Sequence, residues 1–219
     1  MKNIPLTGLS TNCSPQRRSW RRGLFFCLLP ACILSCSRQP VVIEGRLPDL
    51  RYDGEVVYLV PLEGARAENV DSACIRQGAF RFESSMGEGG DVFIIRTRPL
   101  LRLDLEELLV IKEPGRLRVR LDSVSSASGT ALNDSLQQWK EEKQQYDALQ
   151  SQLRKELKTA DDARREYIIA RKEQTERDHT RYAYHFVMGN RENVAGRFVY
   201  GLSKSLFTPE QRQALQMPD

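Results

Sequence analysis

The sequence predicts an α+β protein, in which an N-terminal antiparallel β-sandwich or barrel of about seven or eight short strands precedes a helical hairpin or small bundle. Three observations support this fold class. Between residues 41 and 122 apolar and polar residues alternate, which is the period of half-buried strands. After residue 133 apolar residues recur at three- and four-residue steps, as in amphipathic helices. Before residue 36, a short apolar run follows a basic segment, which is typical of a secretory signal.

Residues 1–35 are expected to be a lipoprotein signal peptide that is cleaved. They contain five basic residues, no acidic residue and an apolar stretch at 23–34 that is shorter than the roughly 20 residues needed to span a bilayer. The segment Ile33-Leu34-Ser35-Cys36 resembles a bacterial lipobox, in which the peptidase cuts before the cysteine and the thiol carries a diacylglycerol. This resemblance implies that Cys36 is the lipidation site, labelled by palmitate, and that residues 36–40 form the acylated cysteine and a short tether.

Removal of the signal changes what the composition implies. Five of the 33 Lys and Arg residues and none of the 29 Asp and Glu residues lie in the first 35 positions, so 28 basic residues face 29 acidic ones in the remainder. This balance argues against nucleic acid as a partner. Cys74 is the only cysteine after Cys36, so no cysteine cluster for a metal is expected, and we interpret Cys74 as a small, inert, buried residue.

The predicted β domain covers residues 41–122. Turn signals at Asp53-Gly54, Gln77-Gly78 and Glu113-Pro114-Gly115 divide it into segments of alternating or apolar character. The expected strands are residues 41–47, 55–62, 70–76, 79–83, 91–97, 101–105, 108–111 and 117–121. Short strands joined by tight turns favour antiparallel pairing over a parallel sheet.

A polar linker is expected at residues 123–133 and a helical region at 134–219. One apolar stripe predicts a long helix that ends near Leu157, and Thr159 with Asp162 three residues later resembles a capped restart. The second helix should end at residues 190–193, and a third should cover 195–206. Thr208 followed by Pro209 predicts the N-cap of a short fourth helix.

No catalytic, metal-binding or cofactor-binding constellation is predicted. His179 and His185 are six residues apart on a helix, about 240° around its axis, so they should not share a metal and are expected to serve surface or packing roles. The adjacent carboxylates at 106–107, 141–142 and 161–162 point in different directions, whereas acid–base catalysis needs groups that converge on one substrate.

Several segments together resemble a domain of unknown function. They are residues 42–47, 57–59, 70–72, 78–82, 109–121, and 128–130 with Asn133. In the family resembled, this domain lies at the N-terminus of envelope lipoproteins whose C-terminal half is a thioredoxin-like, alkyl hydroperoxide reductase-like or thiol–disulfide oxidoreductase domain. The family's redox chemistry resides in a Cys-x-x-Cys, which this chain lacks, so no redox residue can be carried over.

We therefore expect a non-catalytic lipoprotein, anchored to the membrane through its lipid, that binds or positions an envelope protein partner. Two alternatives stay open: the amino-terminal part of a thiol–disulfide oxidoreductase, and a sandwich that binds a small ligand or glycan, for which Tyr58 is nearly the only aromatic candidate. Ser37, where an inner-membrane retention signal has Asp, favours the outer membrane and its periplasmic face.

Overall fold

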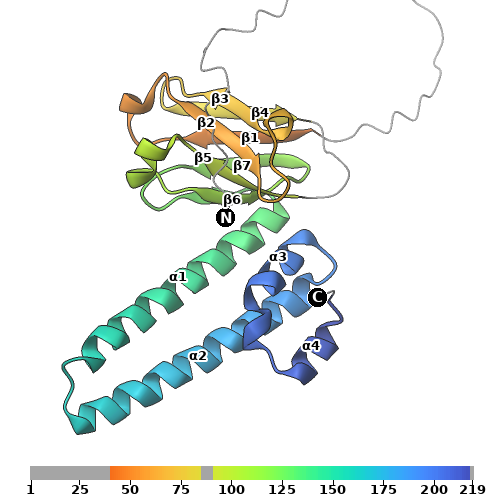
Figure 1. Ribbon diagram of the computed structural model, residues 1–219. Helices are drawn as coiled ribbons and strands as arrows, with labels where there is room; N and C mark the ends of the chain where they lie inside the picture. The colour runs from red at the N-terminus through yellow and green to blue at the C-terminus, as the bar shows by residue number, and fades with distance from the viewer. Residues whose placement is uncertain (1–39, 85–90, 218–219) are drawn as a thin grey trace, which may run out of the picture.

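The computed structural model describes residues 40–84 and 91–217, which form two four-stranded sheets followed by helices (Figure 1). The strands within these ranges are β1 (Val41–Arg46), β2 (Val56–Pro61), β3 (Asp71–Cys74), β4 (Ala79–Ser84), β5 (Val92–Arg96), β6 (Leu108–Ile111), β7 (Gly115–Arg120) and β8 (Ser126–Ser128). The four α-helices are α1 (Ala131–Leu157), α2 (Asp162–Asn190), α3 (Val194–Ser203) and α4 (Pro209–Leu215). The predicted α+β fold is confirmed, and its β part is an open sandwich.

The two sheets have the strand orders β4-β1-β7-β8, here called sheet A, and β3-β2-β5-β6, called sheet B. Five of the six strand pairings among the described residues are antiparallel, as expected. The exception is β1, which lies parallel to β7, with Glu44 opposite Arg118. Between these two strands the chain forms all four strands of sheet B and also β4, and this long crossover allows a parallel pair that tight turns cannot make.

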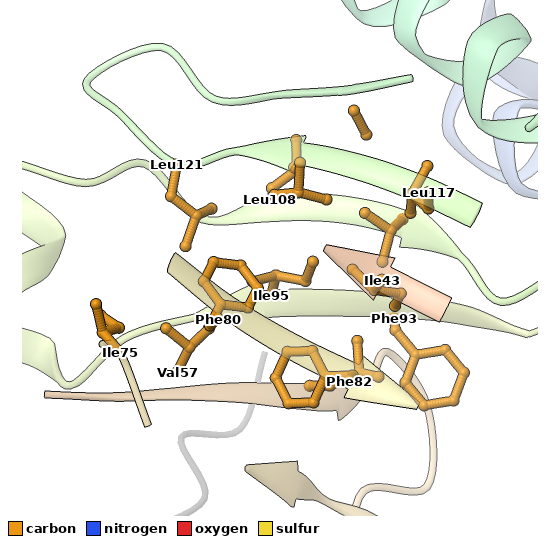
Figure 2. Close-up of a cluster of buried hydrophobic side chains, with 14 of the residues drawn as sticks. Ile43, Val57, Ile75, Phe80, Phe82, Phe93, Ile95, Leu108, Leu117 and Leu121 are labelled. Atoms are coloured by element: carbon orange, nitrogen blue, oxygen red, sulfur yellow. The ribbon is translucent and has the colours of Figure 1, made fainter. Parts of the chain in front are cut away.

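The main core lies between the two sheets (Figure 2). Alternation along each strand directs one set of side chains inward. The inward residues labelled in Figure 2 come from sheet A and its strand ends (Ile43, Phe80, Phe82, Leu117 and Leu121) and from sheet B and its strand ends (Val57, Ile75, Phe93, Ile95 and Leu108). The rings of Phe80 and Phe82 meet edge to face at 5.7 Å. Gly45 faces Phe80 across the β1–β4 pair, and a Cβ there would lie 1.9 Å from the Phe80 ring. The glycine therefore makes the space that Phe80 fills.

The predicted strand at 101–105 is wrong, because the segment begins with a 3-10 helix at Pro99–Leu103. Pro99 occupies the first turn of this helix, and the Leu101 N–H donates to the Arg98 carbonyl. Leu105 is buried while Leu103 is 87% exposed, so the apolar alternation of this segment does not mark one buried face.

Residues 123–133, expected to be a linker, contain β8 and the first turn of α1. Strand β8 pairs with β7, with Ala127 opposite Val119, and Ala127 packs in the main core. Three residues of small side chains are too few to display a period of two, so the sequence pattern did not reveal this strand.

Helices α1 and α2 form a long antiparallel hairpin that projects away from the sandwich, and α3 and α4 pack at its base (Figure 1). The N-cap of α2 is Asp161, whose carboxylate accepts from the Arg164 N–H, and not Thr159 as predicted. The expected third helix ends as the 3-10 turn Lys204–Leu206. The predicted cap of α4 is confirmed, because Thr208 and Gln211 form a reciprocal capping box.

A second core joins the helices to the outer face of sheet B. Ile111 of β6 packs with Leu136 and Trp139 of α1. The other buried members of this core come from α2, α3, α4 and the segment before α4: Ala183, Val187, Ala195, Val199, Tyr200, Phe207 and Leu215. Farther along the hairpin, Leu153 of α1 and Ile168 of α2 are buried. The helical hairpin is thus stabilised by apolar contacts both at its base and along its length.

Candidate functional site

The proposed lipidation residue Cys36, the signal at 1–35 and tether residues 37–39 lie outside the described residues, so these expectations stay predictions. Pro40 is described, and its carbonyl accepts from the Gly115 N–H at 3.2 Å. Pro40 therefore lies directly before β1 and beside the first residue of β7. Within the described part of the chain, no helix is both long and apolar enough to cross a bilayer.

The two histidines occupy separate environments on α2. His179 is buried, and its ring stacks on Tyr146 of α1 with ring centroids 4.1 Å apart. Burial, with a smaller contribution from Lys143, lowers the pKa of the His179 imidazole. His185 is exposed, and its ring meets that of Tyr184 edge to face. In residues 40–84 and 91–217, no group of three or more His, Cys, Asp or Glu is placed to hold a metal.

Two other sequence interpretations need correction. Cys74, expected to be an inert buried residue, is only partly buried. Tyr58, considered as an exposed aromatic for ligand stacking, is only 6% exposed. The observation that would have favoured a glycan-binding sandwich is therefore missing from the described chain.

Helix α1 lies across one edge strand of each sheet, β6 and β8. Three of its polar side chains form hydrogen bonds with backbone groups of these strands that no neighbouring strand pairs. The Asn133 carboxamide accepts from the Ile111 N–H and donates to the Ile111 carbonyl, both at 2.8 Å, as a neighbouring strand would. Lys140 donates to the Leu109 carbonyl at 3.4 Å, and Gln137 accepts from the Ala127 N–H at 3.2 Å. These residues, four and three positions apart on one helix face, satisfy edge groups of β6 and β8.

A carboxylate from the β6–β7 turn anchors the first turn of the same helix. Oε1 of Glu113 accepts from the backbone N–H groups of Leu132 and Asn133 at 2.9 and 3.0 Å. It also accepts from Nδ2 of Asn133 at 3.0 Å, and that amide reaches Oγ1 of Thr130 at 2.9 Å. Glu113 thus caps the positive end of α1, a role that the Thr130 side chain does not perform. We call Glu113, Thr130, Asn133, Gln137 and Lys140 the joint.

The joint is largely shielded from water, so water cannot readily replace a lost hydrogen bond within it. Asn133 is only 2% exposed, so its amide cannot turn to solvent for alternative partners. Burial lowers the pKa of Lys140 to about 8, although Glu106 and Glu141 oppose the effect. A buried polar network of this kind fixes one relative orientation of sheet and helix, because any slip leaves edge groups unpaired.

The outer surface of sheet A forms a second candidate site, which we call the arginine face. Its five exposed arginines come from three adjacent strands: Arg81 of β4, Arg46 of β1, and Arg116, Arg118 and Arg120 of β7. Alternation places the three arginines of β7 outward, because Leu117 and Val119 between them are buried.

Carboxylates neutralise part of the arginine face. Glu44 forms ion pairs with Arg81 and Arg116, Glu83 lies 3.6 Å from Arg81, and Asp122 pairs with Arg120 at 2.9 Å. Arg46 and Arg118 make no ion pair within the described residues. A groove of about 860 Å³ adjoins this face at the edge where β4 of sheet A approaches β3 of sheet B, and its charged lining residues are Glu44, Arg46, Arg76, Arg81 and Arg118. The groove therefore carries an excess of positive charge.

Sequence reasoning identified neither the joint nor the arginine face. The segment GRLRVR at Gly115–Arg120 signals a row of arginines on one strand face. The contributions of Arg46 and Arg81 depend on the parallel register of β1 with β7 and on the pairing of β1 with β4, which no local pattern encodes. No local pattern marks Asn133 as a binding residue, because its partner Ile111 lies 22 residues earlier.

Comparison with known proteins supports part of the resemblance. Residues 41–136 match the model of a family described as a domain of unknown function (DUF4369). The match begins at the first residue of β1 and ends within α1, so it contains the whole sandwich and the joint residues Glu113, Thr130 and Asn133. Neither a curated protein nor a solved structure matches the chain.

Proposed function

We propose that the protein is a lipid-anchored module of the cell envelope that acts without catalysis by holding a partner at a fixed place relative to the membrane. The observation that carries the proposal is the joint, which fixes a long helical hairpin to a sandwich that begins at Val41. Only residues 37–40 separate Cys36 from β1, and four residues extend at most roughly 14 Å. A sandwich on so short a tether stays close to the bilayer.

The hairpin extends away from the sandwich and determines how far from it a partner can be held. Helix α1 has 27 residues, which corresponds to about 40 Å at the usual helical rise. Much of the surface of α2 is charged and exposed, and Tyr167 and Ile169 are large apolar side chains exposed on it. We propose that this helical hairpin, and not the sandwich, presents the surface that meets the envelope partner.

The anchor is tested by metabolic labelling of the full chain with radioactive palmitate. The wild-type protein should be labelled and should fractionate with membranes, whereas Cys36→Ala should lose both properties. Labelling that survives Cys36→Ala would contradict the anchor.

The positioning role is tested with a photo-crosslinking residue at the exposed position Ala170 of α2 in the anchored protein. A specific crosslink to an envelope protein is expected, and Asn133→Ala should weaken it at equal levels of folded protein. The matched variant Asn69→Ala removes an exposed amide and should leave the crosslink intact. A crosslink equally strong in all three proteins would contradict a positioning role for the joint.

A second candidate function rests on the family resemblance and on the match over residues 41–136. We propose that the module serves a thioredoxin-like thiol–disulfide oxidoreductase domain, either in the same polypeptide or as a separate partner. The DNA after the codon for Asp219, together with the size of the native protein on an immunoblot, decides between the two arrangements. A frame that continues into Trp-Cys-x-x-Cys, with a band far above 25.1 kDa, indicates one polypeptide.

A further inference from the structure

We infer that the arginine face binds the phosphate groups of anionic lipid headgroups, so that sheet A rests with its outer surface on the membrane. The first argument is charge. Arg46, Arg81, Arg116, Arg118 and Arg120 share this surface, and their carboxylate partners are fewer: Glu44, Glu83 and Asp122. Arginine is the side chain best suited to phosphate, because its planar guanidinium offers paired donors.

The second argument is the crowding of like charges on this face, where Arg46 and Arg118 have no carboxylate partner within the described residues. Arg46 and Arg120 are direct cross-strand partners in the parallel β1–β7 pair, and both are exposed. Along β7, Arg116, Arg118 and Arg120 follow each other on one face at spacings of about 7 Å. Like charges placed directly opposite on neighbouring strands are destabilising, and a bound anion relieves the repulsion.

The third argument identifies the occupant by position. Pro40 is hydrogen-bonded to Gly115, so the tether enters sheet A beside the strand that carries three of the arginines. The choice of a lipid headgroup, in place of another phosphate compound, rests on the proposed anchor at Cys36. With a tether of four residues, a face-on orientation brings all five arginines to the headgroup layer, where each basic residue contributes to binding.

The experiment uses the full chain carrying Cys36→Ala, so that binding does not depend on acylation. Co-sedimentation is measured with vesicles of phosphatidylcholine alone and of phosphatidylcholine mixed with phosphatidylglycerol. We expect a preference for the anionic vesicles that falls roughly five-fold for each arginine removed in Arg46→Gln and Arg118→Gln. The double variant Arg46→Lys/Arg118→Lys should retain most of the preference, because its charge is unchanged.

A matched pair of substitutions separates the arginine face from net charge. Arg165→Gln with Arg171→Gln removes two exposed arginines from α2, and neither makes an ion pair within the described residues. This control should bind anionic vesicles nearly as well as the parent chain. Equal losses in the two double variants, or no preference for anionic vesicles, would overturn the inference. Thermal unfolding checks the variants, and Arg46→Gln/Arg118→Gln should be at least as stable as the parent.

A further arm distinguishes lipid phosphate from free phosphate. Inorganic phosphate is added to the anionic vesicles and compared with chloride at the same ionic strength. Equal release by both salts supports a headgroup surface, whereas release specific to phosphate assigns the groove to a soluble ligand and overturns the lipid assignment. Because all proteins here carry Cys36→Ala, loss of the anchor in the palmitate experiment and loss of headgroup binding are separate results.

Discussion

At the scale of single residues, Asn133 has the largest structural consequence among the polar side chains. Its amide completes the edge of β6 and also reaches Glu113 and Thr130, and it does so while buried. Asn133→Ala should therefore lower the free energy of unfolding by about 3 kcal/mol, since several buried groups lose their partners at once. Denaturant unfolding measures this, with the exposed Asn69→Ala, expected within about 1 kcal/mol of wild type, as control. Similar values for the two variants would contradict the role given to Asn133.

Gly45 supplies a second prediction at this scale. A methyl group there would overlap the buried Phe80 ring, so Gly45→Ala should destabilise the fold by about 1–3 kcal/mol. Combination with Phe80→Leu should recover part of the loss, because the two positions share one space.

In contrast, Gly201→Ala in α3 adds a methyl group with no atom within 4 Å and should stabilise by up to about 1 kcal/mol. Thermal unfolding of the four proteins gives these values, and additive effects of the Gly45 and Phe80 changes would contradict the shared space.

At the scale of elements, the α1–α2 hairpin contains a buried imidazole whose protonation should weaken it. Burial and Lys143 lower the folded-state pKa of His179 below its ordinary value of 6.5, although Asp147 and Glu142 oppose this. The unfolded chain thus binds the proton more readily, so this stabilising contribution is complete above pH 6.5 and declines as pH falls, down to the folded pKa. Unfolding followed between pH 7 and acidic values, in roughly half-unit steps, measures the decline. His179→Phe should reduce this loss of stability at low pH, and His185→Gln should leave it unchanged. If the pH dependence of His179→Phe equals that of the wild type, His179 is not its cause.

Elements also differ in how far the sequence predicts them. Long amphipathic helices and alternating strands were located because each displays its own burial period. The segment at 99–105 was misassigned because a 3-10 helix beginning at Pro99 can show the same alternation over five residues. Strand β8 was missed because Ser126–Ser128 is too short to show any period. The joint and the arginine face were out of reach for a different reason: both depend on strand edges and registers that bring distant residues together.

At the scale of the whole molecule, the sandwich and the helical hairpin are connected by polar and apolar contacts of different kinds. Ile111 packs into the helical core, while its backbone groups are held by Asn133. Apolar packing alone would allow the hairpin to slide slightly against sheet B. The hydrogen bonds between Asn133 and the Ile111 backbone do not allow this, because sliding would break them. The arginine face and the hairpin therefore keep a constant relation to each other, which the proposed positioning function requires.

The most direct test of this account is the distance distribution between the sandwich and the hairpin in the full chain. Spin labels attached through an unnatural amino acid at the exposed positions Glu83 and Ala148 leave the native cysteines unchanged. Pulsed electron paramagnetic resonance should give one narrow distribution for the wild-type protein and a broader one for Asn133→Ala. A broad or multimodal distribution in the wild-type protein would contradict a fixed joint, and with it the proposed positioning function.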